Sequence, residues 1–489
     1  MFINKKKLHL IIIVIFHTII HLTQLNGMGD DAESIYFPIN KITVIDNIID
    51  CCEQCKTYCS QIIHFFSPHV LENEPNPLEF MLNAIDELSE NPAQFEIQSI
   101  PILSLRDITD LVTCVKNKLT MDLSLKLQPK SVETLLHPQQ GIYLQALIVP
   151  QNTRIVTIGD LHGEVHALTQ IIRSLQSKNL MDQYGNLAPC TYLVFLGDLI
   201  DRGHYSIETL ALALLLKKQN PDHIIIMRGN HEQLNLMAKY GTIQECITKY
   251  GKIDATTIIK NFIPLFDLLP QACFIGIQSN DQKIQFLQFN HGGLPYSFNY
   301  ESPSAYQQDP LFVYDLTEPI DTFIKTFLLR CALNTLRSTT FFYCINEMPK
   351  NNGFLWSDFV NHDQIYTSSD HRSIGVIASD QAFNAYTQKI NTPNSALLCG
   401  IIRGHQHMRH GINQFHTIDT ISRAPENPNG WLPLESGITI PCTQHHTNLP
   451  IFTITSRPNT YNCNAYALVH YDDATQTWML TPHIMYDTL

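Results

Sequence analysis

The sequence predicts an α/β fold in which several strands end at one shared rim and carry metal-liganding residues there. Five apolar runs of β type read RIVTI, YLVFL, HIIIM, KIQFLQF and LLCGII. Each run leads into a short cluster that contains Asp, Asn or His, and the clusters are Gly159–Gly163, Gly197–Gly203, Arg228–Glu232, His291–Gly293 and Arg403–His407. Ligands bind at the carboxyl ends of strands in open α/β sheets, so five clusters in this position predict one composite site.

Helices are predicted between these strands and upstream of them. Residues Glu164–Gln176 follow the first cluster with amphipathic periodicity, and Ile207–Gln219 follow the second. Upstream, Leu105–Leu119 has helical periodicity and Ser131–Leu136 indicates another helical turn. The alternation of strand, loop and helix predicts buried strands covered by helices.

Three segments are expected along the chain, because 489 residues exceed an ordinary single domain. Residues 1–27 are expected to form a signal-like or anchor segment, 28–100 an N-terminal, mostly helical extension, and 101–489 the domain that carries the five clusters. Insertions are expected in that domain near 301–350 and 422–450. The second is rich in Pro, Asn and Thr, which is typical of a surface loop.

The first residues have the pattern of a targeting segment. Residues 4–22 read NKKKLHLIIIVIFHTIIHL, a basic start and then an apolar run that is short for a membrane-spanning helix. We therefore expect a secreted or exported protein. The alternatives are a membrane anchor through residues 8–22 and a cytoplasmic protein with a plain apolar leader, and membrane contact is expected only through this segment.

Charge and cysteine content narrow the function classes further. The net charge is −13, from 32 Lys and Arg against 45 Asp and Glu, and this argues against non-specific nucleic-acid binding. An anionic substrate stays open, because bound cations can reverse the local field. The thirteen cysteines cannot all pair within the chain. Cys51, Cys55 and Cys59 share one face of a helical pattern, and a half-buried helix face explains them better than a zinc site. No pattern indicates the oligomeric state.

The five clusters supply the ligand types that a site with two divalent cations requires. Phosphate-ester hydrolysis needs an activated water and compensation of negative charge, and two cations sharing one carboxylate provide both. Carboxylates together with imidazoles favour Mn, with Fe and Zn as alternatives, over Ca. Asp160 and His162 suit the first ion and Asp198 the bridge, while the second ion takes Asn230, His291 and His405. We expect His407 and His410 to be solvated.

Six blocks in this order resemble the signature of the PPP class of serine/threonine phosphoprotein phosphatases. The blocks are GDLHG, GDLIDRG, RGNHE, HGGL, LWSD and RGHQ, and they cover about residues 150–410. The resemblance implies a calcineurin-like metallophosphoesterase fold, a β-sandwich flanked by helices. It also implies a phosphoprotein substrate, hydrolysed by direct attack of a metal-bridging hydroxide. The loop at Ile451–Cys463 departs from the family's SAPNY-type segment, with Arg457 in place of a small residue.

The resemblance assigns the remaining site residues. His231 would protonate the leaving group, and Asp201 would hold it. Arg202 and Arg372 would bind phosphate oxygens together with Asn230. A phosphotyrosine-specific phosphatase and a dinucleoside-polyphosphate hydrolase on the same fold remain alternatives. A non-catalytic scaffold is disfavoured because every expected ligand is present.

Overall fold

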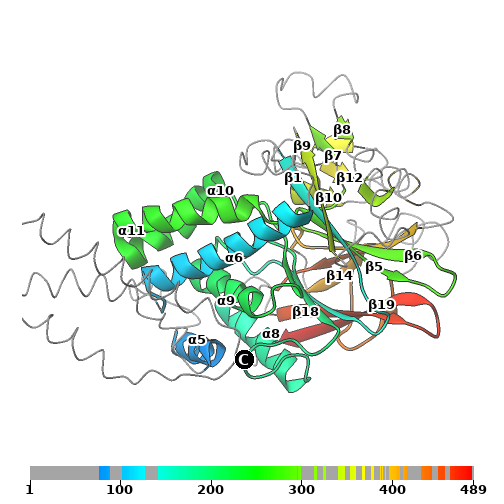
Figure 1. Ribbon diagram of the computed structural model, residues 1–489, viewed down its shortest axis with the longest axis horizontal. Coiled ribbons are helices and arrows are strands. Elements are labelled where there is room, and N and C mark those ends of the chain that lie inside the picture. The colour runs from blue at the N-terminus through cyan, green and yellow to red at the C-terminus, as the bar shows by residue number, and fades with distance from the viewer. Residues whose placement is uncertain are drawn as a thin grey trace, which may run out of the picture. The chain divides into compact units, whose positions relative to one another are not determined.

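Two β-sheets packed face to face carry the strands that the sequence predicts (Figure 1). In this computed structural model the described residues all lie within the unit His69–Leu489. They are 76–88, 102–126, 141–294, 296–298, 313–315, 323–325, 340–346, 353–359, 366–368, 376–378, 386, 388, 391, 396–407, 411–415, 431–442, 450–456 and 463–486. The predicted leader, the Cys51–Cys59 segment, the turn at Ser131–Leu136, Arg372 and His410 lie outside these ranges.

The first sheet has six strands in the order β16-β19-β18-β2-β3-β4. Its strands are β2 (Arg154–Ile158), β3 (Thr191–Phe195), β4 (Ile224–Ile226), β16 (Ile440–Pro441), β18 (Cys463–Asp472) and β19 (Thr477–Tyr486). Strand β3 pairs in parallel with β2 and with β4, and Phe195 lies opposite Ile158 on one side and Ile226 on the other. The carboxyl ends of these three strands are therefore level.

The second sheet has eight strands in the order β15-β14-β17-β13-β6-β5-β1-β9. Its strands are β1 (Gly141–Ile148), β5 (Ala272–Gln278), β6 (Ile284–Asn290), β9 (Thr340–Asn346), β13 (Ala396–Arg403), β14 (Ile412–Phe415), β15 (Trp431–Pro433) and β17 (Ile451–Ile454). Strands β6 and β13 run in parallel with Asn290 opposite Arg403, so these two strands also end together. The five predicted strands are confirmed as β2, β3, β4, β6 and β13.

Alternating side chains of β2 separate the two layers of the core. Val156 and Ile158 pack in a cluster with the helices. Ile155 points the other way and packs against residues of the eight-stranded sheet, among them Ile275 and Leu287. This period of two places one apolar layer between the sheets and a second under the helices. The predicted β-sandwich with flanking helices is thereby confirmed.

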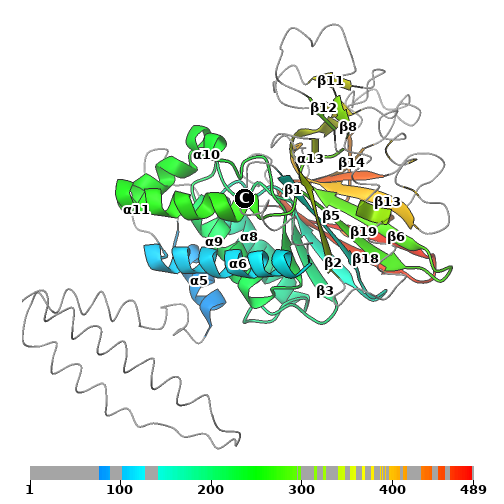
Figure 2. The same cartoon turned by 45° about the horizontal axis from the view of Figure 1, so that its top comes forward.

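A layer of helices covers the outer face of the six-stranded sheet. It consists of α5 (Pro77–Asp86), α6 (Leu105–Lys126), α8 (Val165–Ser177), α9 (Ser206–Gln219), α10 (Leu234–Tyr240) and α11 (Thr242–Asp267). The short α13 (Gly353–Trp356) is not part of this layer and contacts β7 (Tyr296–Phe298). Figures 1 and 2 show α6, α9 and α11 beside one another on the same side of the strands. The helices predicted before and after the first two clusters correspond to α6, α8 and α9. Helix α6 is longer than predicted, because neither Gly nor Pro interrupts the chain before Pro129.

Helices α10 and α11 were not predicted from the sequence. Helix α11 contains Gly251, which has φ of 74° and kinks the helix, and it also contains Pro264. Gly and Pro both have low helix propensity in a helix interior, so the local sequence does not predict a helix here. Burial of its apolar face against α6 and α9 overrides that preference: Ile258, Phe262 and Phe266 are fully or almost fully buried.

The two expected insertions contribute strands to the sheets. Within 301–350, β9 pairs antiparallel with β1 at the sheet edge, and β8 (Val313–Asp315) pairs with β7 (Tyr296–Phe298). Within 422–450, β15 and β16 pair with β14 and β19, and Trp431 is buried. The expected surface loop is present between these two short strands, where Glu435–Thr439 are exposed, while the buried Trp431 anchors the start of the described part. A small sheet of β10 (Asp358–Phe359), β11 (Tyr366–Ser368) and β12 (Val376–Ala378) completes the fold.

Among the helices in the described ranges, none is both long enough and apolar enough to cross a membrane.

Candidate metal centre

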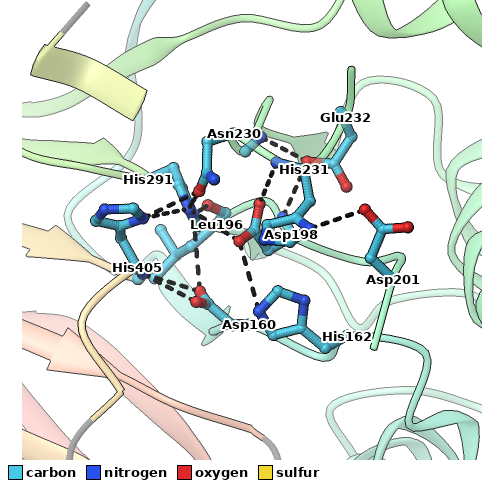
Figure 3. A network of polar contacts seen from close by, with 12 residues as sticks. Asp160, His162, Leu196, Asp198, Asp201, Asn230, His231, Glu232, His291 and His405 are labelled. Carbon is cyan, nitrogen blue, oxygen red and sulfur yellow. Dashed lines mark hydrogen bonds and ion pairs between the residues drawn. The ribbon is translucent and has the colours of Figure 1, made fainter. Parts of the chain in front are cut away.

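The six predicted metal ligands converge at the rim where the strands end (Figure 3). Asp160 and His162 follow β2, Asp198 follows β3 and Asn230 follows β4. From the other sheet, His291 follows β6 and His405 follows β13. An isolated parallel bridge between Asp160 and Thr455 joins the ends of the two sheets here. Residues 245 positions apart in the sequence thus become neighbours. The backbone N–H of His405 donates to both oxygens of the Asp160 carboxylate, at 3.0 and 3.1 Å.

Asp198 lies at the centre of the donor set. Its Oδ2 is 3.2 Å from His291 Nε2 on one side and 3.5 Å from His162 Nε2 on the other. Its second oxygen, Oδ1, accepts a hydrogen bond from the backbone N–H of His231 at 2.9 Å. The carboxylate is therefore fixed with one oxygen between two groups of imidazoles, which is the position a bridging ligand requires.

A second group of donors forms around Asn230. Its Oδ1 is 2.8 Å from His291 Nε2 and 3.0 Å from His405 Nδ1, and these two nitrogens are 3.2 Å apart. All three side chains are buried. Such a concentration of lone pairs is unfavourable unless protons or a cation compensate it, so the donors present fit a divalent ion.

Backbone carbonyls select the tautomer of two imidazoles. His162 donates from Nδ1 to the Ile200 carbonyl at 3.0 Å, and His291 donates from Nδ1 to the Leu196 carbonyl at 3.0 Å. Each contact leaves Nε2 as the lone-pair nitrogen, aimed at Asp198. This arrangement is typical of metal-binding histidines, whose other nitrogen is held by a backbone carbonyl or a carboxylate.

The local field favours positive charge at this point. Burial opposes a charged imidazole, yet Asp198 and Asp160 raise the pKa of His291. Burial also disfavours an ionised Asp198, but the imidazoles of His291, His231 and His162 hold its pKa well below the usual range. A bound cation would gain from the same carboxylates.

His407 belongs to this centre, so the expectation that it is solvated was wrong. Its side chain is 11% exposed, and its Nε2 lies 3.0 Å from Asp160 Oδ2. The same nitrogen is 3.2 Å from His162 Nε2. With Asp160 and His162 it forms a donor group whose ligand atoms lie within 4.8 Å of one another. The spacing of two residues from His405 was the available signal in the sequence.

The loops around the site adopt a conformation that non-glycine residues rarely take. His162, Asp198, Asp201, Arg202 and His405 all have positive φ, between 47° and 71°. Such backbone persists where surrounding contacts determine it, and it concentrates at functional sites. Two glycines permit the close approach of these loops: a Cβ at Gly229 would collide with Asp198, and one at Gly404 would collide with Asp160.

Glu232 connects two of the loops, a role that was not assigned from the sequence. Its carboxylate accepts backbone N–H groups from Asp198 at 3.0 Å, Leu199 at 2.9 Å and Gly229 at 2.7 Å. Burial, and then repulsion from Asp198, raises the pKa of Glu232 to about 7. Three donors to one carboxylate fix the loops after β3 and β4 relative to each other.

His231 and Asp201 form a pair beside the donor groups. The distance from His231 Nδ1 to Asp201 Oδ2 is 2.8 Å, and both side chains are almost fully buried. The other ring nitrogen, Nε2, is 3.0 Å from Nη2 of Arg202, whose residue is exposed. A guanidinium on the exposed side of a buried imidazole is suited to bind an oxyanion that enters from solvent.

Comparisons with known proteins cover this same region. The family model of the calcineurin-like phosphoesterases matches residues 153–409, more than half of the chain. The chain is 35% identical over 210 residues to the PP2A-like serine/threonine-protein phosphatase PPG1 of Candida albicans, covering 42% of this chain and 44% of that protein. It is 37% identical over 147 residues to the serine/threonine-protein phosphatase SIT4 of the same species, covering 30% and 41%.

The chain thus spans less than half the length of these curated relatives. A solved protein serine/threonine phosphatase of Saccharomyces cerevisiae, described as similar to human phosphatase PP5, gives a TM-score of 0.44 at 17% identity, with 79% of this chain and 91% of that chain covered.

The position of His407 leads to a first prediction. His407→Ala should weaken one of two Mn²⁺-binding events by about tenfold or more, since losing even an indirect partner of a metal costs about 10–100-fold. Isothermal titration with Mn²⁺ measures both events. His223→Ala changes an exposed histidine before β4 and should leave both unchanged. Identical titrations for both variants and the unmodified protein would contradict the role of His407.

Proposed function

The chain belongs to the calcineurin-like phosphoesterase family, and on that premise we propose that it is a metal-dependent protein phosphatase acting on phosphoserine and phosphothreonine monoesters. The observation that carries the proposal is the shared carboxylate of Asp198, with the His231–Asp201 pair beside it. Similarity to two serine/threonine-protein phosphatases over the same region supports the substrate class.

The residues fit two divalent cations, one between Asp160, His162, Asp198 and His407 and the other between Asp198, Asn230, His291 and His405. When bound, such ions acidify a water molecule and neutralise the charge of phosphoryl oxygens. We propose Mn as the metal, with Fe and Zn as alternatives, because the donors mix carboxylates with imidazoles.

Arg202 and Asn230 would bind the phosphate group. The Arg202 guanidinium lies on the exposed side of His231, where it can turn two N–H groups toward a phosphate that enters from solvent. Asn230 directs its Oδ1 toward His291 and His405, so its amide N–H is the part that would donate to a phosphate oxygen. Arg372 lies outside the described residues and remains a predicted third contact.

His231 would supply the proton for the leaving group. Its Nδ1–H donates to Asp201, so Nε2 is the nitrogen that carries the transferable proton toward the substrate. The buried Asp201 carboxylate stabilises the imidazolium and fixes the ring orientation. Water attacks phosphorus directly from the opposite side, and no phosphorylated residue forms on the protein. An alkoxide leaving group such as serine depends on this proton, whereas an aryl oxide depends on it less.

A phosphotyrosine-specific phosphatase and a dinucleoside-polyphosphate hydrolase on the same fold are the alternatives, and the first test below compares all of these substrates. Export of the protein through residues 1–27 also remains a proposal, which N-terminal sequencing of native material would test.

The first test compares substrate classes with purified protein. We expect release of phosphate from phosphoserine and phosphothreonine peptides, loss of activity with a chelator and recovery with Mn²⁺. Faster turnover of phosphotyrosine or of a dinucleoside polyphosphate would replace the proposed substrate. Asp198→Asn is the matched inactive variant, because it removes charge from the shared ligand while keeping its size. A near-normal rate in that variant would show that the ligands are wrongly assigned.

The second test concerns the acid. His231→Asn should slow phosphoserine peptides by about 10²–10⁴-fold, the range of general acid catalysis, and slow p-nitrophenyl phosphate much less. A larger loss of rate on the phosphoserine peptide than on p-nitrophenyl phosphate indicates loss of proton donation, whereas structural disruption of the site would slow both substrates equally. Equal losses on both substrates would remove His231 from the acid role.

A further inference from the structure

Thr242, the first residue of α11, contacts the carboxylate that holds His231. Its Oγ1–H donates to Asp201 Oδ1 at 2.5 Å, and its backbone N–H donates to the same oxygen at 3.2 Å. In return the backbone N–H of Asp201 donates to Thr242 Oγ1 at 3.1 Å. Both residues are completely buried. The Thr242 hydroxyl therefore contacts both the side chain and the backbone of Asp201, and it shares the Asp201 N–H with Ser206 Oγ, at 3.2 Å.

The oxygens of Asp201 are divided between two partners. Oδ1 is held by Thr242, and Oδ2 is 2.8 Å from His231 Nδ1. A carboxylate held at one oxygen cannot rotate about its Cβ–Cγ bond without breaking that contact. Thr242 thus determines where Oδ2 lies and, through it, the plane of the His231 ring.

The turn before α11 brings Thr242 to this position. The Arg202 N–H donates to the Tyr240 carbonyl at 2.9 Å, so the loop after β3 is joined to the turn at two successive residues. Gly241 has φ of 117°, a value that favours glycine, and it lets the chain leave α10 and begin α11 at once. The loop and turn form one unit, although 41 positions separate Asp201 from Thr242.

The next turn of α11 holds the same loop at its far end. Glu245 accepts the backbone N–H groups of Ser206 at 2.9 Å and Ile207 at 3.2 Å, which begin α9. Lys249 compensates the buried charge, with its Nζ 2.8 Å from Glu245 and 2.6 Å from Glu208. These contacts are independent of Thr242 and keep α11 in place, so removal of the Thr242 hydroxyl should leave the helix docked.

We propose that Thr242 is a positioning residue that holds Asp201 so that His231 stays aligned for proton transfer. The inference rests on the proposed function, because proton transfer to a leaving group is the step it serves. Valine matches threonine in shape and lacks the hydroxyl, whereas serine keeps the hydroxyl. These two replacements separate the hydrogen bond from packing.

The experiment uses Thr242→Val, Thr242→Ser and the control Thr248→Val. Thr248 lies on the same helix and is exposed. Its Oγ1–H donates to the Gln244 carbonyl at 2.9 Å, and its Oγ1 accepts from Gln244 Nε2 at 3.4 Å, so its contacts stay within α11 and away from Asp201. Thr242→Val should lower kcat on a phosphoserine peptide by about tenfold, a part of what general acid catalysis supplies, and change kcat on p-nitrophenyl phosphate by less than about twofold. Thr242→Ser and Thr248→Val should retain both rates.

A double variant decides whether Thr242 acts through His231. In a His231→Asn background, Thr242→Val should cause no further loss on the peptide, because the group that it positions is already gone. The same loss in both backgrounds, or equal losses on both substrates, would overturn the inference. If the unmodified protein hydrolyses neither substrate, the proposed function fails instead, so the two failures are distinguishable.

Discussion

The structure depends on the sharing of one carboxylate, that of Asp198, between donor groups that come from both sheets. Its Oδ2 lies 3.2 Å from His291 and 3.5 Å from His162, so a displacement of either sheet would separate the groups. The parallel register of β2, β3 and β4 levels three strand ends, and the register of β6 with β13 levels two more. Sheet register is therefore the constraint that sets the geometry of the site.

Bringing these metal-ligand side chains together costs folding free energy, which contacts with the surrounding structure offset. Several site residues have a left-handed backbone conformation, which costs about 1–3 kcal/mol for each residue. In addition, buried lone-pair donors of different side chains face one another. Backbone groups supply the compensation. The carbonyls of Leu196 and Ile200 orient two imidazoles, and Glu232 joins two loops through three N–H groups. The polar site is thus supported by contacts that do not themselves touch a substrate.

Much of this arrangement was predictable, because its strands are apolar runs that end in polar clusters. The five strands, the helices α6, α8 and α9, and the convergence of six ligands follow from such local patterns. His407 was missed because its approach to Asp160 follows a left-handed turn at His405, with φ of 66°, which periodicity does not reveal. Helix α11 was hidden by Gly251 and Pro264, and the contact between Thr242 and Asp201 is non-local. Tertiary packing determines the position of His407, the formation of α11 and the contact between Thr242 and Asp201, and local sequence patterns do not report it.

A crystal structure of the protein with Mn²⁺, in which anomalous scattering locates the ions, tests most directly whether Asp198 is shared by two cations. We expect two peaks about 3.5–4 Å apart, on either side of the Asp198 carboxylate. One peak should lie among Asp160, His162 and His407, and the other among Asn230, His291 and His405. A single peak, or ions bound away from Asp198, would contradict the claim that this carboxylate is shared by two cations.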